Sequence, residues 1–345
     1  VILAGDTTSS VVLSALPDNL DEDDETIVIT MDALIQNGVR GSPFQATTTI
    51  LDDDLPPTMT LSVNPASIFE DTETSTVTAT LNVVSGRIVT VSLAKAGTAT
   101  EGVDYTLAGQ IVIPEGSLSA SVTLLPISDP LNEDDETVVI FVSSVANGID
   151  ASTVQTVTIN NDDLPPTVTL SASPASIVEN AGTTTKVTAT LSTASSFNVT
   201  VTLIKSGTTA TNDFDLNGTS IVIPAGNLAG FVTVTAFGDL LNEDDETVIL
   251  DIDTVTKGTK GSPSQATLTI TNDDALPTVI LSVTPATINE NGGTTASTIT
   301  AELSAVSSFD VIIGLALTGS ATNIADYTIA TTTLTVFAGN TMCCR

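Results

Sequence analysis

The chain has 345 residues, and 8 Lys and Arg stand against 41 Asp and Glu, which gives a formal net charge of −33. A surface of that sign repels nucleic acids and anionic lipids, so we expect neither as a partner. With no His, and no apolar run long enough to span a bilayer, the chain should hold no zinc, copper or iron and should not insert into a membrane.

The apolar residues favour strands over helices. They make up 41% of the chain, but aromatic residues contribute only 3%, and Val, Ile, Leu and Ala alternate with Thr over long stretches. β-Branched side chains lose rotamer freedom in a helix and fit a pleated, half-buried surface. The composition therefore predicts an all-β protein.

Two markers repeat along the chain. The segments LDEDDETI and LNEDDETV begin at Leu20, Leu131 and Leu241, and the preceding Asp18, Asp129 and Asp239 are 111 and 110 residues apart. A short acidic segment followed by proline recurs at residues 52–58, 161–167 and 272–278. Both markers indicate one structural unit of about 110 residues.

In chain order, this period predicts four parts. Residues 1–54 are the C-terminal half of a repeat, residues 55–163 and 164–274 are complete repeats, and residues 275–345 are the N-terminal half of another. The two halves contain complementary parts of one repeat. Copies of the chain would then join head to tail by strand complementation, or the sequence belongs to a longer repeat array; both interpretations stay open.

The second complete repeat shows seven short segments with alternating apolar and polar residues, separated by Gly, Asn, Pro and Ser. They are residues 167–171, 186–192, 198–204, 220–224, 231–237, 247–253 and 266–272. This pattern predicts an antiparallel, two-sheet Greek-key sandwich with a Thr-rich solvent face, and the tandem repeats predict an elongated rod.

Each repeat carries acidic residues at four of its turns. An isolated acidic run is usually a solvated loop, but here the acids recur in register at every period. Calcium accepts six to eight oxygen ligands in flexible geometry, whereas magnesium requires a near-ideal octahedron. The acidic turns therefore predict a calcium site. They do not form an EF-hand loop, since residues 18–29 lack the glycine at its sixth position.

Four motifs together resemble the Calx-β domain: SxxE after the first strand, GTAT followed by DY or DF, D-x-x-x-E-x-x-E, and a closing NDD. The resemblance implies an immunoglobulin-like β-sandwich with calcium in the loops at one end. It implies these ligands in the complete repeats: Glu70, Asp104, Asp129, Glu133, Asp162, Asp163, Glu179, Asp213, Asp239, Glu243, Asp273 and Asp274. In the half repeats it implies Asp18, Glu22, Asp53, Asp54, Glu290 and Asp326.

Catalysis is not expected, because hydrolase nucleophiles need a neighbouring base such as His, and glycosidase clefts need aromatic platforms. We expect a calcium-binding structural or adhesive repeat protein of an extracellular surface, with calcium stiffening the ends of its modules. Its adhesive target stays open. Two other functions also stay open, namely a calcium-sensing regulatory module of a larger membrane protein and a carbohydrate-binding sandwich.

Overall fold

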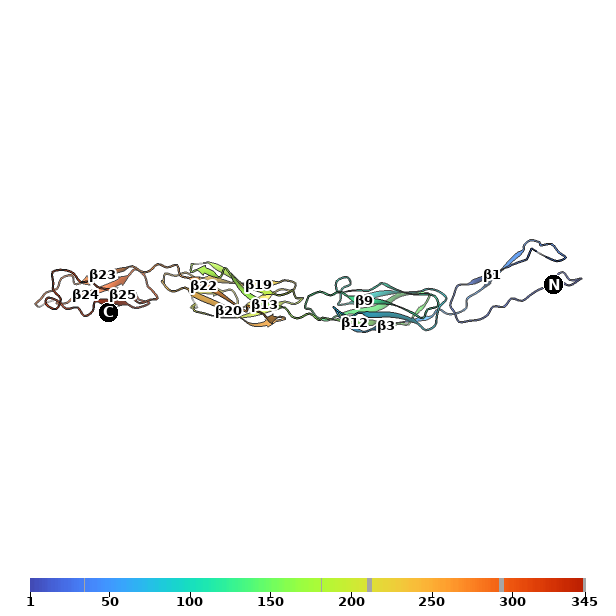
Figure 1. Ribbon diagram of the computed structural model, residues 1–345, viewed down its shortest axis with the longest axis horizontal. Coiled ribbons are helices and arrows are strands. Elements are labelled where there is room, and N and C mark those ends of the chain that lie inside the picture. Colours follow the sequence, from blue (N-terminus) through green and yellow to red (C-terminus); the bar gives the residue numbers. More distant parts are fainter. Residues whose placement is uncertain (34, 181, 210–212, 292–294, 344–345) are drawn as a thin grey trace. The chain divides into compact units, whose positions relative to one another are not determined.

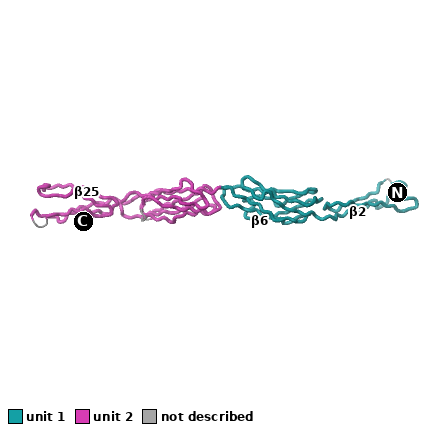
Figure 2. The backbone as a smooth tube through the Cα atoms, turned by 90° about the horizontal axis from the view of Figure 1, so that it is seen from below, with its two compact units in different colours: residues 1–163 teal, residues 164–345 magenta. Residues whose placement is uncertain are grey.

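The computed structural model describes residues 1–33, 35–180, 182–209, 213–291 and 295–343. These residues form strands and connecting loops, and none of them belongs to a helix that could cross a membrane. The predicted all-β class is confirmed. The chain divides into two compact units, residues 1–163 and 164–345, which Figure 2 draws in different colours.

Residues 55–163 of the first unit form two five-stranded sheets (Figure 1). One sheet has the order β4-β12-β10-β6-β8 and the other β11-β3-β5-β9-β7. The strands are β3 (Thr58–Asn64), β4 (Ser67–Phe69), β5 (Ser75–Leu81), β6 (Val89–Gly97), β7 (Tyr105–Thr106), β8 (Gln110–Ile113), β9 (Ser119–Pro126), β10 (Glu136–Ala146), β11 (Ile149–Asp150) and β12 (Gln155–Asn160).

The alternating sequence builds the core between these sheets. In β5, Val77, Ala79 and Leu81 are buried, whereas the intervening Thr residues are exposed or half-buried. One cluster of buried apolar side chains joins strands of both sheets, among them Val77 of β5 and Ile140 of β10. Side chains of successive strand residues point to opposite faces, so this period places one face on the core.

Residues 164–274 repeat the same topology, with the orders β14-β22-β20-β16-β18 and β17-β19-β15-β13-β21. The strands are β13 (Thr167–Ser173), β14 (Ser176–Val178), β15 (Thr184–Leu191), β16 (Val199–Gly207), β17 (Phe214–Leu216), β18 (Ser220–Ile223), β19 (Ala229–Ala236), β20 (Glu246–Thr256), β21 (Thr259–Lys260) and β22 (Gln265–Thr271). All seven predicted segments are strands, and β14, β17 and β21 are additional.

The pairing is antiparallel except at short sheet edges. Strands β4 and β14 pair in parallel with β12 and β22, and β11 and β21 pair in parallel with β3 and β13. The sequence predicted only antiparallel pairing, because these edge strands are too short for an alternating pattern. The pairing of β4 with β12 and of β14 with β22 affects the acidic turns, because β4 and β14 end next to Glu70 and Glu179.

The two ends of the chain form smaller sheets of two strands each. They are β1 (Glu25–Thr30) with β2 (Gln45–Ile50), β23 (Val279–Thr284) with β24 (Thr298–Leu303), and β25 (Val311–Gly314) with β26 (Thr333–Val336).

Leu281 is 50% exposed, whereas Leu61 and Leu170 at the matching positions are 5% and 2% exposed. Cys343 packs into a small core with Ala301, and Cys344 lies outside the described residues.

Candidate metal centre

The loop after β6 is held against the first residues of β10. Gly97 has a φ of +121°, and a Cβ at this position would lie 2.0 Å from the carbonyl oxygen of Thr137. The amide of Thr137 donates to Oγ1 of Thr98 at 2.8 Å, and the amide of Ala99 donates to the Thr137 carbonyl at 3.1 Å. Only glycine permits this approach, which brings the loop that carries Asp104 to the start of β10.

Asp104, Glu133 and Glu136 form one group of acids, whose ligand oxygens lie within 4.8 Å of one another. The three side chains are half-buried. Burial and a hydrogen bond with Asp104 raise the pKa of Glu136 to about 7. Burial and the neighbouring charge of Asp104 also raise the pKa of Glu133. Three carboxylates this close repel one another unless protons or a cation neutralise them.

A second group joins Glu70, Asp129 and Asp163, again with ligand oxygens within 4.8 Å. Glu70 is 8% exposed and directly follows β4, whereas Asp129 precedes the acidic loop and Asp163 ends the repeat. Burial raises the pKa of Glu70 to about 7, with further contributions from Glu133 and Asp129. Residues far apart in the sequence therefore meet at one end of the sandwich.

The second complete repeat contains the corresponding second group. Glu179, Asp239 and Asp274 lie within the same 4.8 Å, and burial raises the pKa of Glu179 to about 7. Glu246 corresponds to Glu136, and its pKa is raised to about 7 by burial, by the charge of Asp213 and by a hydrogen bond with Asp213. The two complete repeats thus share the chemistry of this pole.

The residues of these groups fit a hard divalent cation. Every donor is a carboxylate oxygen, which suits calcium and excludes the nitrogen and sulfur donors that zinc prefers. Among the residues that the structure describes, four buried carboxylate oxygens have no hydrogen-bond partner: Oε2 of Glu136 and Glu246, and Oδ2 of Asp163 and Asp274. An unpartnered buried acceptor is costly, and a bound cation would satisfy it.

A family model described as the Calx-beta domain matches the chain three times, over residues 3–54, 52–163 and 161–274. These matches cover well over half of the sequence. The chain belongs to the Calx-beta domain family. The acidic groups of residues 55–163 and 164–274 therefore lie in Calx-beta repeats, and residues 1–54 match the same family model. The matched residues end at 274, so the assignment of residues 275–345 to a further half repeat stays a prediction.

Solved structures similar to this Calx-beta chain include "CBD12 from CALX1.2", at 16% identity over 61% of this chain and 99% of that one, with a TM-score of 0.28. The calcium binding domain CBD12 of CALX1.1 is 15% identical over 61% and 98%, with a TM-score of 0.29. The adhesin InvE of Yersinia pseudotuberculosis is 18% identical over 62% and 58%, with a TM-score of 0.29. A search of curated proteins found no match.

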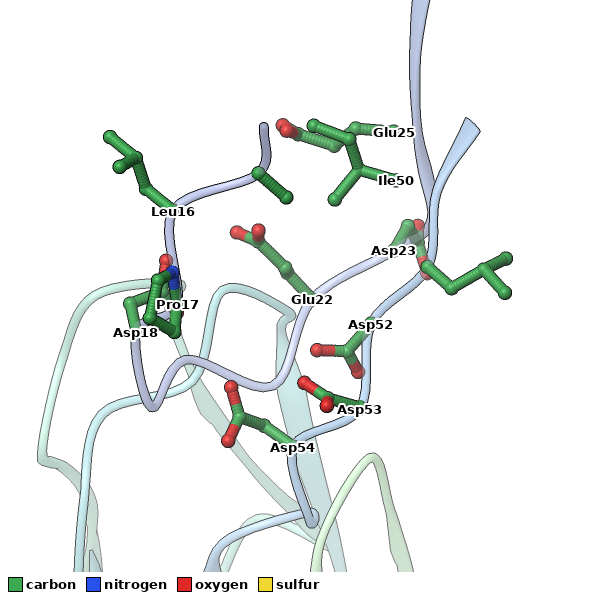
Figure 3. A pocket seen from close by; sticks show the side chains of 12 residues that line it. Leu16, Pro17, Asp18, Glu22, Asp23, Glu25, Ile50, Asp52, Asp53 and Asp54 are labelled. Atoms are coloured by element: carbon green, nitrogen blue, oxygen red, sulfur yellow. The ribbon is translucent and has the colours of Figure 1, made fainter. Parts of the chain in front are cut away.

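The first Calx-beta segment also carries an acidic pole, shown in Figure 3. Asp18 and Glu22 of one segment and Asp52, Asp53 and Asp54 of another line the same pocket. Burial and neighbouring acids raise the pKa of Glu22 and of Asp54. The structure thus brings together the four acids that the sequence predicted here, and it adds Asp52.

Some predicted residues lie outside the groups of three. Asp273 lines a pocket with Glu179, Asp239 and Asp274, and Asp162 contributes to the raised pKa of Glu70. Glu243 lies close enough to Asp213 and Asp239 for its pKa to be raised, mainly by burial.

Glu290 and Asp326 are exposed, and neither belongs to a group of three acids within the described part of the chain. Asp326 accepts a hydrogen bond from the amide of Thr322 at 2.6 Å, as Asp104 does from the amide of Thr100 at 2.5 Å. Residues 275–345 thus keep the hydrogen bond of this loop, but the described acids of this segment do not gather into a group of three.

Sequence reasoning missed Glu136 and Glu246. Both are the final acid of the D-x-x-x-E-x-x-E motif, and both are the first residue of a strand, β10 or β20. The motif includes both residues, but it does not determine which face of the sheet the first side chain of a strand occupies. The approach of Gly97 to Thr137 decides that Glu136 meets Asp104.

Proposed function

We propose that this chain is a calcium-binding structural or adhesive repeat protein of an extracellular surface. The observation that carries the proposal is the group formed by Glu70, Asp129 and Asp163, three carboxylates from separate turns within 4.8 Å of one another. Calcium held there would link the end of the first edge strand, the acidic loop and the last residues of the repeat. The proposed role is mechanical, and no catalytic step is assigned to these residues.

The residues themselves define what the ion would do. In the absence of the ion, burial and repulsion by the neighbouring acids disfavour the ionised forms of Glu70 and Glu136, and the pKa of each is therefore raised. Bound calcium replaces that repulsion by attraction, so the turns stay together when all carboxylates are ionised. The extracellular location is supported by the strongly acidic composition, with 41 Asp and Glu against 8 Lys and Arg.

Isothermal titration of the chain with calcium tests this proposal. An extracellular module binds calcium with a Kd on the order of 10⁻⁴–10⁻³ M, whereas a cytosolic sensor binds on the order of 10⁻⁷–10⁻⁵ M. We expect the weaker range. Binding in the tighter range would instead favour the regulatory module, and absence of binding would contradict both. A carbohydrate site has less support, because only 3% of the residues are aromatic.

A second proposal concerns the half repeats. Ile29 is 51% exposed, whereas Ile140 at the matching position of the complete repeat is fully buried, and Leu281 is likewise exposed where Leu170 is buried. Each end of the chain therefore exposes an apolar residue whose counterpart in a complete repeat is buried. Residues 1–54 of one copy would cover residues 275–345 of another, which would produce head-to-tail filaments.

Two variants test this assembly together. Ile29→Asp should disable the first half and Leu281→Asp the second, so each variant alone should stay monomeric in light scattering. An equimolar mixture retains one working half on each chain and should stop at a dimer. A wild-type chain that is monomeric at every concentration, or a mixture that behaves like its components, would contradict the assembly.

A further inference from the structure

The acidic loop of residues 1–54 contacts the complete repeat that follows it. The amide of Gly86 donates to the carbonyl oxygen of Asp21 at 2.9 Å, and Oγ of Ser85 donates to the same oxygen at 3.3 Å. Asp21 is 2% and Ser85 is 1% exposed. A Cβ on Gly86 would lie 2.9 Å from Cβ of Glu22, so the two backbones are packed tightly.

The same contact recurs between residues 164–274 and residues 275–345. Asn242 occupies the position of Asp21 in the acidic loop, and Ser307–Ser308 occupies that of Ser85–Gly86. The amide of Ser308 donates to the carbonyl oxygen of Asn242 at 3.0 Å, and Oγ of Ser308 donates to it at 3.1 Å. We call the contact at Asp21 the first junction and the contact at Asn242 the last junction.

The first junction contains a positive charge of its own. Arg87 pairs with Asp21 at 3.3 Å, with Asp23 at 2.9 Å and with Asp52 at 3.9 Å, and it also donates to the carbonyl oxygen of Glu22. Asp21 and Asp23 lie in the acidic loop, and Asp52 lies in the closing segment. The guanidinium therefore bridges the two segments whose carboxylates line the pocket in Figure 3. A planar fork of donors suits several carboxylates at once.

The last junction has no such charge. Phe309 stands where Arg87 stands, and no acid of the adjacent pole that the structure describes, Asp239, Glu243, Asp273 and Asp274 included, takes part in an ion pair. Asn242 instead donates from its amide group to the carbonyl oxygen of Asp274 at 3.0 Å. Its position thus depends on the closing segment of the pole, where Oδ2 of Asp274 is buried without a partner.

We propose that the two junctions respond differently to calcium: Arg87 keeps the first junction closed without the ion, whereas the last junction closes only when the pole beside Asn242 holds calcium. The proposal rests on the proposed calcium binding of that pole. At the first junction, the guanidinium of Arg87 supplies the positive charge that calcium supplies at the last junction. Removal of calcium would therefore open the last junction and leave the first one closed.

Hydrogen exchange of two amides tests this in the full chain. The Gly86 amide reports the first junction and the Ser308 amide the last, because each donates to the carbonyl of the preceding repeat. With calcium, both amides should be protected. With EGTA, protection at Ser308 should fall about tenfold or more, while Gly86 stays protected. The amides of β5 and β15 serve as references for folded sandwiches.

Arg87→Phe, which introduces the residue found in the last junction, should make the protection of Gly86 depend on calcium. Arg40→Phe is the matched control, because it makes the same change in an arginine that contacts Phe44 and lies outside the junction. The reverse exchange, Asn242→Asp with Phe309→Arg, should free Ser308 from its dependence on calcium.

Equal responses of Gly86 and Ser308 to EGTA in the wild-type chain would overturn the proposal, as would an Arg87→Phe variant that behaves like Arg40→Phe. Titration of the same sample with calcium distinguishes a failure of the junction proposal from a failure of the proposed calcium binding. If calcium binds but the junctions respond equally, only the junction proposal fails. If calcium does not bind, the proposed function fails with it.

Discussion

Asp104 and Glu136 each place a carboxylate oxygen within 4.8 Å of the other, although Asp104 lies in the loop after β6 and Glu136 at the start of β10. Burial and the neighbouring Asp104 raise the pKa of Glu136 to about 7, so Glu136 keeps its proton up to nearly neutral pH. A cation that enters this site must displace the proton. Calcium binding and protonation are therefore expected to compete at the same atoms.

This competition predicts a pH dependence of calcium binding. Glu70, Glu136, Glu179 and Glu246 all have a pKa raised to about 7, so calcium should bind more weakly at pH 6 than at pH 8 and should release protons near neutrality. Calorimetric titrations in two buffers that differ in ionisation enthalpy measure the released protons. Identical heats in the two buffers at pH 7 would contradict the shared site.

The calcium-free chain should show the opposite trend in stability. The pKa of Glu70 and Glu179 rises from 4.5 to about 7 on folding, so the folded state binds protons more tightly than the unfolded state. The free energy of unfolding should then fall as pH rises from about 4.5 to about 7. Thermal unfolding in EGTA should give a higher Tm at pH 5 than at pH 7.5. An unchanged or rising Tm would show that the pole is neutralised in another way.

Chelation at pH 7.5 should destabilise the complete repeats. Calcium at about a hundredfold excess over Kd adds roughly 2.7 kcal/mol to the free energy of unfolding, which corresponds to roughly 10–20 °C in Tm for a domain of this size. Differential scanning calorimetry with calcium and with EGTA measures the difference. Magnesium at the same concentration is the control and should restore less, because it demands octahedral geometry.

Glu136→Gln tests the acid that the sequence reasoning missed. Loss of one carboxylate charge should weaken calcium binding to residues 55–163 about tenfold or more, since only Asp104 and Glu133 would remain of the three acids in this group. Glu115→Gln is the matched control, because Glu115 is exposed in a turn and belongs to none of the acidic groups described here. Equal calcium affinity of the two variants would exclude Glu136 as a ligand.

Gly97→Ala tests the approach that positions Asp104. The added Cβ would lie 2.0 Å from the Thr137 carbonyl, and the φ of +121° is unfavourable for alanine, so we expect a loss of about 2–4 kcal/mol in the free energy of unfolding. Gly109→Ala is the control, with no atom within 4 Å of its Cβ and no positive φ, and should change stability by less than about 0.5 kcal/mol. Denaturant unfolding measures both variants.

Much of this fold follows from local patterns. The alternation around Val77, Ala79 and Leu81 predicted a strand with one buried face, because successive side chains of a strand point to opposite sides. Two acidic markers that recur about every 110 residues predicted the division into repeats and the acidic turns within them. Alternation and recurring motifs can both be seen in the sequence without knowledge of which loops meet, so the all-β class could be predicted from the sequence alone.

The meeting of the acids depended on the tertiary structure. Glu70, Asp129 and Asp163 converge because the parallel pairing of β4 with β12 places the end of one beside the end of the other. The choice of Glu136 rests on a backbone contact at Gly97, and the bridge made by Arg87 rests on packing between two repeats. Such contacts join residues that are far apart in the chain, and a local sequence pattern does not determine which loops come together.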